Sequence, residues 1–263
     1  MTVYRSERGT PDPATTGHLP VVRRRRTALR WLVALVVIAL LGNLLLVEAY
    51  ANARFAPDSE PVEAGPAPGV PAAVREGGPI IDTSGGQPQS HSMPARTIAL
   101  TFDDGPDPTW TPRILDMLRK HQVHATFFVV GSQVARHPGL TRRLLADGHE
   151  IGAHTFTHPR LGAMSSWRRD PEHSQTQMAL AYAAGVTTSL LRPPYSSFPE
   201  ALDDPGWSTV REAGRDGYLT VLNDTDSRDW ARPGVDAIVK SATPADGAGA
   251  IVLLHDAGGD RAQ

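Results

Sequence analysis

The sequence of 263 residues contains no cysteine. This absence excludes disulfides, thiolate metal ligands and a cysteine nucleophile, so any metal ion must be held by histidine and carboxylate side chains. The chain also lacks an excess of charge of either sign, because its formal net charge is -2 at pH 7. Without a basic excess, nothing in the composition indicates a nucleic-acid partner.

Long apolar runs are scarce as well, and the longest one covers residues 31–47. It carries no charged residue and follows the basic segment Arg23–Arg26. As a helix rising 1.5 Å per residue it would be roughly 26 Å long, near the lower limit for a bilayer core. Because basic clusters stay on the cytoplasmic side, we expect residues 1–30 to form a cytoplasmic tail and residues 31–47 a transmembrane helix.

The same apolar run also fits a cleavable signal sequence. Small residues alternate at Ala49, Ala51 and Ala53, which is the pattern that signal peptidase cleaves. An intact anchor would give a single-pass membrane protein, and cleavage would give a secreted one. Both alternatives put the rest of the chain outside the cytoplasmic membrane.

Residues 48–95 are dominated by proline, glycine and alanine and show neither a helical nor a strand period. Such a segment buries too little apolar surface to offset its ordering entropy, so it is predicted to be a disordered linker. The folded domain is then expected to span residues 96–263.

Short apolar runs alternate with helical patterns in this domain, which predicts an α/β fold with a parallel sheet. Periodicity alone does not choose between a barrel and a doubly wound sheet. Strands are predicted at 97–102, 124–130, 149–154, 188–191, 218–222 and 250–254, and helices at 111–121, 138–147, 174–184, 205–213 and 235–241. The helix at 111–121 is expected to have Thr111 as its N-cap.

Polar residues gather where the predicted strands end, which is where α/β barrels place their active sites. Asp103 and Asp104 are adjacent carboxylates, and their mutual repulsion raises the pKa of one of them unless a cation neutralises it. His154 and His158 lie on a loop and could face one cation together with Asp104. A set of two histidines and a carboxylate is typical of catalytic sites for zinc or a similar divalent metal. The alternatives are a plain Asp-Gly-Pro turn and two surface histidines.

Three further clusters follow later strands. Arg192 begins a proline-rich turn and can bind a carboxylate through two hydrogen bonds. Asp226 and Asp229 stand beside the large apolar side chain of Trp230. His255 comes directly after a strand, and its pKa suits a general acid near neutral pH. Taken singly, these clusters could equally be a rigid loop, a solvated acidic loop and a strand-end histidine whose hydrogen bonds are satisfied.

Together the five segments resemble the five motifs of the NodB-like polysaccharide deacetylases, also called carbohydrate esterase family 4. The segments TFDDGP, HTFTH, RPPY, DSRDW and LLHD occur in the order of that family, over roughly Arg96–Asp256. The resemblance implies a distorted (β/α) barrel of seven strands that removes N-acetyl groups from sugar polymers.

The resemblance also implies a role for each matching residue. One divalent metal ion, Zn2+ or alternatively Co2+, would be held by Asp104, His154 and His158. Asp103 would be the general base. The other roles implied are orientation of the base by Arg192, general acid catalysis by His255, control of the charge of His255 by Asp226 or Asp229, oxyanion binding by a backbone N–H near Tyr195, and an acetyl pocket shaped by Trp230 and Leu253.

The chain departs from the family at its end, because it stops at Gln263 whereas the family continues with another helix and a closing strand. We therefore expect a C-terminally incomplete barrel, and a glycosyltransferase module after it in the full-length protein, as in some relatives with a similar anchor.

The expected function is hydrolysis of N-acetyl groups on an extracellular polysaccharide that contains N-acetylglucosamine, such as peptidoglycan or a chitin-like polymer. The alternatives are a non-catalytic cell-wall glycan-binding domain, a metal-dependent amidase for a smaller substrate and a purely structural metal site.

Overall fold

The computed structural model describes residues 31, 33–38, 69–196, 198–245, 247–259 and 261. The chain divides into two units, Met1–Ser59 and Glu60–Gln263. In the first unit the described residues are helical, and their apolar side chains are mostly exposed. Nowhere in the described part of the chain is there a helix with the length and apolarity needed to span a bilayer. Most of the predicted tail, anchor and linker lies outside the described residues, so the anchor stays a prediction.

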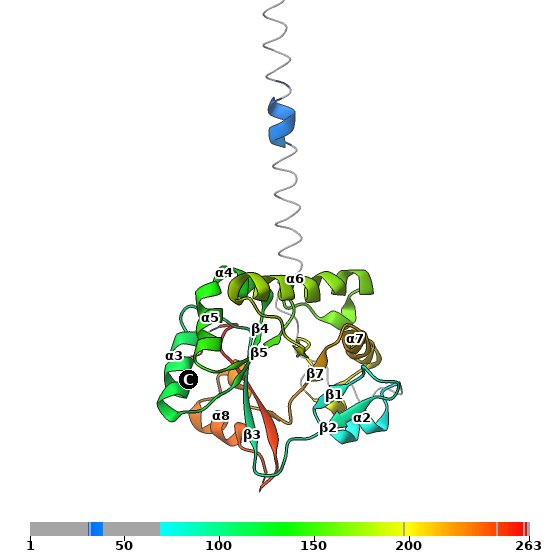
Figure 1. Cartoon of the computed structure of the whole chain (residues 1–263), viewed down its shortest axis with the longest axis vertical. Coiled ribbons are helices and arrows are strands. Elements are labelled where there is room, and N and C mark those ends of the chain that lie inside the picture. The colour runs from blue at the N-terminus through cyan, green and yellow to red at the C-terminus, as the bar shows by residue number, and fades with distance from the viewer. Residues whose placement is uncertain are drawn as a thin grey trace, which may run out of the picture. The chain divides into compact units, whose positions relative to one another are not determined.

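A nine-stranded sheet organises the second unit (Figure 1), and its strand order is β2-β1-β7-β6-β5-β4-β3-β9-β8. The seven strands from β7 to β8 in that order run parallel, whereas β1 pairs antiparallel with β7, and β2 with β1. The strands are β1 (Ile80–Asp82), β2 (Gln89–His91), β3 (Ile98–Asp103), β4 (Thr126–Val129), β5 (Glu150–Ala153), β6 (Leu190–Leu191), β7 (Leu219–Val221), β8 (Thr225–Asp226) and β9 (Ala250–His255).

The sheet is curled but open. Within the described residues β2 and β8 are its two edges and do not pair with each other. The α/β class predicted from the sequence is confirmed, and the barrel takes the form of a half-barrel with seven parallel strands and two antiparallel ones.

The predicted helices are all present, with two differences at their starts. The helices are α2 (Ala72–Gly77), α3 (Thr111–His121), α4 (Gly131–Arg136), α5 (Pro138–Ala146), α6 (Ser166–Ala184), α7 (Asp204–Arg215) and α8 (Val235–Ala242), and the 3-10 turns are η1 (Leu161–Ala163), η2 (Pro199–Ala201) and η3 (Asp229–Ala231). Helix α6 begins at Ser166 rather than at residue 174. Thr111 is wrongly predicted as an N-cap, because it is the first helical residue and its hydroxyl hydrogen-bonds Asp256 instead.

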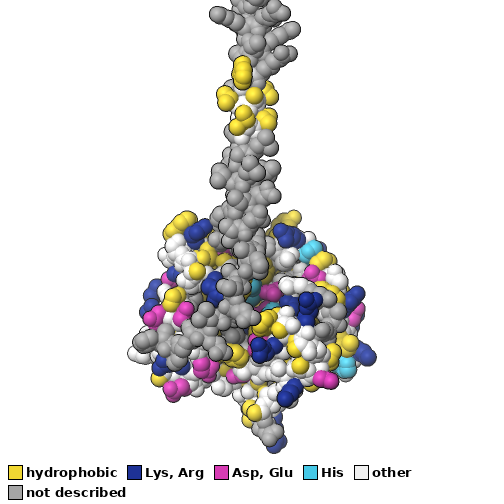
Figure 2. Space-filling view, turned by 180° about the vertical axis from the view of Figure 1, so that it is seen from behind, with side chains coloured by type: hydrophobic (Ala, Val, Ile, Leu, Met, Phe, Trp, Pro, Cys, Tyr) yellow, Lys and Arg dark blue, Asp and Glu magenta, His cyan; other side chains and the backbone are white. Residues whose placement is uncertain are grey.

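The surface of this unit mixes charges of both signs. On the face shown in Figure 2, acidic and basic side chains are interspersed among apolar and neutral ones. This pattern agrees with the small formal net charge of the whole chain.

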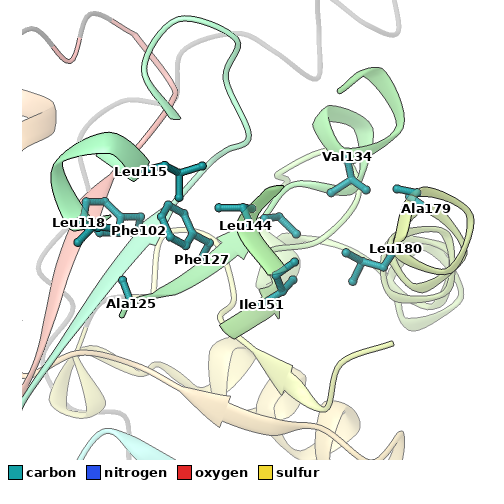
Figure 3. Packing of buried hydrophobic residues seen from close by; sticks show 12 residues of the cluster. Phe102, Leu115, Leu118, Ala125, Phe127, Val134, Leu144, Ile151, Ala179 and Leu180 are labelled. Carbon is teal, nitrogen blue, oxygen red and sulfur yellow. The ribbon is translucent and has the colours of Figure 1, made fainter. Parts of the chain in front are cut away.

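The main core lies between strands β3 to β5 and the helices α3, α5 and α6 that cover them (Figure 3). Phe102 and Phe127 stack with their ring centroids 5.0 Å apart. Leu115 of α3, Leu144 of α5 and Leu180 of α6 are fully buried around them. Burying side chains of this size stabilises the fold by about 1.5–3 kcal/mol each, and the cluster includes Phe102 of β3 and Ile151 of β5.

A second core cluster shows that the domain begins before residue 96. Val70, Val74 and Ile81 are buried and pack with Trp207 and other residues of the α7 region. The predicted linker over 48–95 is therefore wrong for residues 69–94, which contain α2, β1 and β2. Their elements are short and stand among many prolines and glycines, so no period of 2 or 3.6 emerges from the sequence.

Candidate metal-dependent hydrolytic site

The candidate residues meet at the carboxyl-terminal edge of the parallel sheet. Asp103 is the last residue of β3, and His255 is the last residue of β9. These two residues are direct partners in the β3–β9 register. His154 follows β5 and Arg192 follows β6 at the same edge. Because parallel strands end together, residues more than a hundred positions apart in the chain share one site.

Asp104, His154 and His158 form a group that could hold a metal ion, with one ligand atom from each lying within 4.8 Å of the others. The Nε2 atom of His158 is 3.1 Å from Asp104 Oδ1, and that of His154 is 3.6 Å from the same oxygen. The two imidazole rings tilt toward each other with centroids 4.9 Å apart. The predicted ligand set therefore converges on one point.

The ring nitrogens are oriented for metal binding. The Nδ1–H of His154 donates to the carbonyl of Arg192 at 2.7 Å, which leaves the Nε2 lone pair facing Asp104. Burial, together with the neighbouring His158, lowers the pKa of His154 to about 4, against the opposing effect of Asp103. His154 is thus neutral at pH 7. A neutral imidazole held through its other nitrogen is the usual arrangement of a metal-binding histidine.

The carboxylate of Asp104 gives a direct test of whether a cation fits this group. Its Oδ1 atom is buried, and His158 Nε2 lies 3.1 Å from it without the alignment of a regular hydrogen bond. Burial alone would raise the pKa of Asp104, but this contact and the charge of His158 outweigh it and hold that pKa well below its usual range. An ionised oxygen buried without an aligned donor is costly unless a cation binds it. The residues present therefore fit a divalent metal ion.

The loop that carries the two histidines is held by α6. Glu172 on α6 accepts hydrogen bonds from the backbone N–H groups of Phe156 and Thr157, at 2.9 and 2.7 Å, and from the hydroxyl of Thr157 at 2.6 Å. His158 itself has a φ of 60°, a conformation that non-glycine residues adopt only where the surroundings enforce it. Glu172 therefore positions the loop that carries the candidate metal ligands, and sequence analysis missed it because it lies outside every motif.

Asp103 is held by a fully buried arginine. Arg192 is 1% exposed, and its Nη1 donates to Asp103 Oδ1 and to Thr101 Oγ1, both at 2.8 Å. Its other nitrogens donate to the carbonyls of Val221 at 3.0 Å and Leu222 at 3.2 Å. The second carboxylate oxygen of Asp103 lies 3.7 Å from His154 Nε2. Asp103 is thus fixed beside the metal-ligand group, with one oxygen turned toward it.

His255 is paired with Asp229 at the other side of the site. Its Nδ1 lies 2.7 Å from Asp229 Oδ1, and its backbone N–H donates to Asp229 Oδ2 at 2.8 Å. Burial alone would lower the pKa of His255, but Asp229, with Asp104 and Asp103, raises it to about 9. His255 is therefore protonated at neutral pH. Of the two predicted acids, Asp226 does not contact His255 and instead accepts the backbone N–H of Arg228 at 2.8 Å.

Asp256, which sequence analysis left without a role, braces the loop that carries Asp104. It is buried and accepts hydrogen bonds from the backbone N–H of Gly105 and from the hydroxyl of Thr111. A Cβ on Gly105 would collide with this carboxylate, so only glycine fits there. Burial raises the pKa of Asp256 to about 7, and Asp104 and Asp103 add to the rise. Its place directly after His255 was the signal that could have identified it.

The three predicted substrate-binding residues differ in their surroundings. Tyr195 is 45% exposed and meets His158 edge to face, with ring centroids 4.8 Å apart. Trp230 is 42% exposed in η3, next to Asp229. Leu253 is buried in β9 and pairs with Thr101 of β3. Tyr195 therefore presents aromatic surface beside the candidate ligand His158, and Trp230 presents it next to Asp229, whereas Leu253 is buried in the sheet.

The chain as a whole is similar to known proteins. Residues 90–216 match the family model described as polysaccharide deacetylase. The chain is 43% identical over 170 residues to a peptidoglycan-N-acetylglucosamine deacetylase of Bacillus cereus, covering 64% of this chain and 76% of the relative. It is 42% identical to a chitooligosaccharide deacetylase of Bradyrhizobium, and the match covers 61% of this chain and 71% of that relative. A family 4 carbohydrate esterase from Streptomyces lividans, solved with acetate, has a similar structure, with a TM-score of 0.54, 34% identity, and coverage of 62% of this chain and 81% of the esterase.

Proposed function

Because the chain belongs to the polysaccharide deacetylase family, we propose that it hydrolyses the N-acetyl groups of an extracellular polysaccharide containing N-acetylglucosamine and releases acetate. One observation carries the proposal. A buried carboxylate, Asp103, and a protonated histidine, His255, lie at adjacent strand ends on the edge where Asp104, His154 and His158 converge. Peptidoglycan and chitin-like polymers are the candidate substrates, since relatives that act on each are similar to this chain.

Asp104, His154 and His158 would hold one divalent ion, which we propose to be Zn2+, with Co2+ as the alternative. Two imidazoles and one carboxylate are a common donor set for zinc in catalytic sites. When bound, the ion supplies positive charge that polarises the acetyl carbonyl and acidifies a water molecule.

Asp103 is suited to take the proton of the attacking water. It lies beside the ligand group without belonging to it, so its second oxygen is left to contact a water molecule rather than the ion. Arg192 holds the other oxygen at 2.8 Å, which fixes the direction of the free one. A positioned base of this kind contributes about 10²–10⁴-fold to the rate.

His255 is suited to give a proton to the departing amine. The amine of the sugar leaves poorly as an anion, so it must be protonated as the C–N bond breaks. Asp229 keeps His255 charged until that step and fixes its Nδ1, which leaves Nε2 to donate. Base and acid on neighbouring strands can thus act at the two ends of one amide.

The location of the reaction is part of the proposal. The basic segment Arg23–Arg26 and the apolar residues 31–47 support a membrane anchor with the catalytic unit outside the membrane. A wall-bound glycan would then be within reach of the domain.

The proposal is tested by measuring acetate release from peptidoglycan glycan strands, from N-acetylglucosamine oligomers and from small N-acetyl compounds. The assays use the full 263-residue chain, once loaded with Zn2+ and once after treatment with a chelator. We expect release from the polymers that the chelator abolishes and that added metal restores. Release only from the small compounds would favour an amidase instead, and no release from any polymer by the metal-loaded chain would refute the proposal.

A further inference from the structure

Two arginines stack on the two exposed aromatic side chains at the ends of the candidate site. The guanidinium carbon of Arg160 lies 4.9 Å from the ring centroid of Tyr195, and that of Arg228 lies 6.0 Å from the ring centroid of Trp230. Both arginines are exposed. The reaction outlined above uses neither of them.

The first pair is attached to the metal-ligand end of the site. His158 contacts the ring of Tyr195, and the guanidinium of Arg160 lies over the same ring, so the three side chains are in contact through Tyr195. Arg160 follows His158 by two residues, and the intervening Pro159 is buried and restricts the backbone between them. The positive charge of Arg160 is therefore held near the metal ligands.

The second pair is attached to the acid end. Trp230 directly follows Asp229, the partner of His255. Arg228 precedes Asp229 and is fixed by its own backbone, because its N–H donates to Asp226 Oδ1 at 2.8 Å and its φ is 56°. The DSRDW segment thus presents an arginine and a tryptophan together beside the general acid.

Among the described residues, neither Arg160 nor Arg228 forms an ion pair with a carboxylate. A guanidinium stacked on an aromatic ring keeps the N–H groups at its edge free, and these match the two oxygens of a carboxylate. The aromatic rings beside them offer flat apolar surface for sugar rings. Each end of the site therefore combines a surface for a sugar with a donor fork for an anion.

The chain as a whole carries no excess of positive charge that would attract anions. The formal net charge is -2, and charges of both signs are interspersed on the face shown in Figure 2. A preference for a charged glycan must therefore come from groups at the site.

We propose that Arg160 and Arg228 are specificity-determining residues that favour a glycan bearing carboxylate groups on the sugars next to the N-acetylated one over a neutral glycan. The inference rests on the proposed deacetylase function and names its substrate class. Lactyl or peptide carboxylates on the neighbouring sugars would supply the anions that the two guanidinium groups can bind.

The test measures kcat/KM for acetate release by the metal-loaded chain on two substrates. One is carboxylate-bearing peptidoglycan glycan strands, and the other is neutral N-acetylglucosamine oligomers of similar length. The variants are R160Q, R228Q and the double variant. R211Q is the matched control, because Arg211 also stacks on an aromatic ring, that of Trp207 at 5.9 Å, but lies on α7 in the helical layer.

We expect the double variant to lose roughly tenfold in kcat/KM on the anionic glycan, mainly through KM, and to change less than about twofold on the neutral one. The preference of the unmodified chain should shrink as salt approaches about 1 M, where charges are screened beyond about 3 Å. R211Q should behave like the unmodified chain.

Equal losses on both glycans, or no loss on either, would overturn the inference while leaving the deacetylase function intact. If the unmodified chain releases acetate from neither glycan, the proposed function fails, and this inference fails with it.

Discussion

His255 lies in the field of three carboxylates from two segments of the chain. Asp229 bonds it directly, while Asp104 and Asp103 act through their charge. Together they overcome the effect of burial and raise its pKa to about 9. This residue therefore stays protonated throughout the neutral range and loses its proton only as the pH rises through about 9.

We expect D229N to move the alkaline limb of the kcat–pH profile to lower pH by about 1–2 units. The physical reason is that a hydrogen bond to a charged group contributes about 1.5–3 kcal/mol and one pKa unit corresponds to about 1.4 kcal/mol. The measurement is kcat for acetate release between pH 5 and pH 10, taken on the metal-loaded chain.

D226N is the control for that shift, because Asp226 bonds the backbone of Arg228 and not the imidazole. Its alkaline limb should stay where it is in the unmodified chain. An equal displacement in both variants, or none in D229N, would contradict the role assigned to Asp229.

Arg192 is predicted to be as important for the stability of the fold as for the orientation of Asp103. It is buried, and its donors serve Asp103, Thr101 and two backbone carbonyls. R192M would leave Asp103 buried without its counter-charge, which costs about 3–5 kcal/mol. Urea unfolding should show this loss, whereas R211M, at an exposed position of α7, should change stability by less than about 0.5 kcal/mol. A loss below about 1 kcal/mol in R192M would show that the pair is dispensable for folding.

At the scale of elements, α6 connects the core to the candidate metal ligands. The buried side of α6 places Leu180 in the main core and, about two turns earlier, Glu172 against the loop that ends in His158. A helix packed in this way holds the loop rigid without contributing a ligand.

We expect E172Q to weaken metal binding by about 10–100-fold with little change in secondary structure, as is typical when a group behind a ligand is altered. Competition with a chromophoric chelator measures this affinity. Glu150, exposed at the amino end of β5, provides the control E150Q, which should bind metal like the unmodified chain. Unchanged affinity in E172Q would mean that the loop holds its own shape.

The segment containing α2, β1 and β2 is predicted to be part of the folding unit. Ile81 in β1 is 1% exposed and packs in the second core cluster. I81A should destabilise the domain by about 2–5 kcal/mol, measured by chemical unfolding. V235A on α8, where the side chain is exposed, should have almost no effect. If I81A were equally harmless, residues 69–94 would not belong to the core.

Elements that are long and amphipathic could be predicted from the sequence, whereas several short ones, among them β1, β2 and β8, could not. Helix α3 has the predicted bounds because its apolar residues repeat at helical spacing over 111–121. Strand β8 has two residues, and β1 and β2 have three each, too few for any period to appear. Their conformation is set by pairing with distant strands such as β7 and β9, which local sequence does not reveal.

For the whole molecule, the parallel sheet explains why the site could be predicted so far from sequence alone. Asp103, His154, Arg192 and His255 each stand at the end of a predicted strand, and parallel strands bring such ends together. Glu172 could not be identified from the sequence because it acts from within a helix and not from a strand end. The choice of Asp229 over Asp226 also needed coordinates, since both acids follow the same strand-like segment.

The central claim is that Asp103 acts as a base beside the metal-ligand group of Asp104, His154 and His158, rather than as a ligand. The most direct measurement is acetate release per bound metal ion by D103N, whose amide oxygen can still accept from Arg192. We predict that D103N binds one equivalent of Zn2+ as the unmodified chain does, while kcat falls by about 10²–10⁴-fold. A D103N variant that keeps kcat within about threefold, or that loses the metal along with activity, would contradict the account.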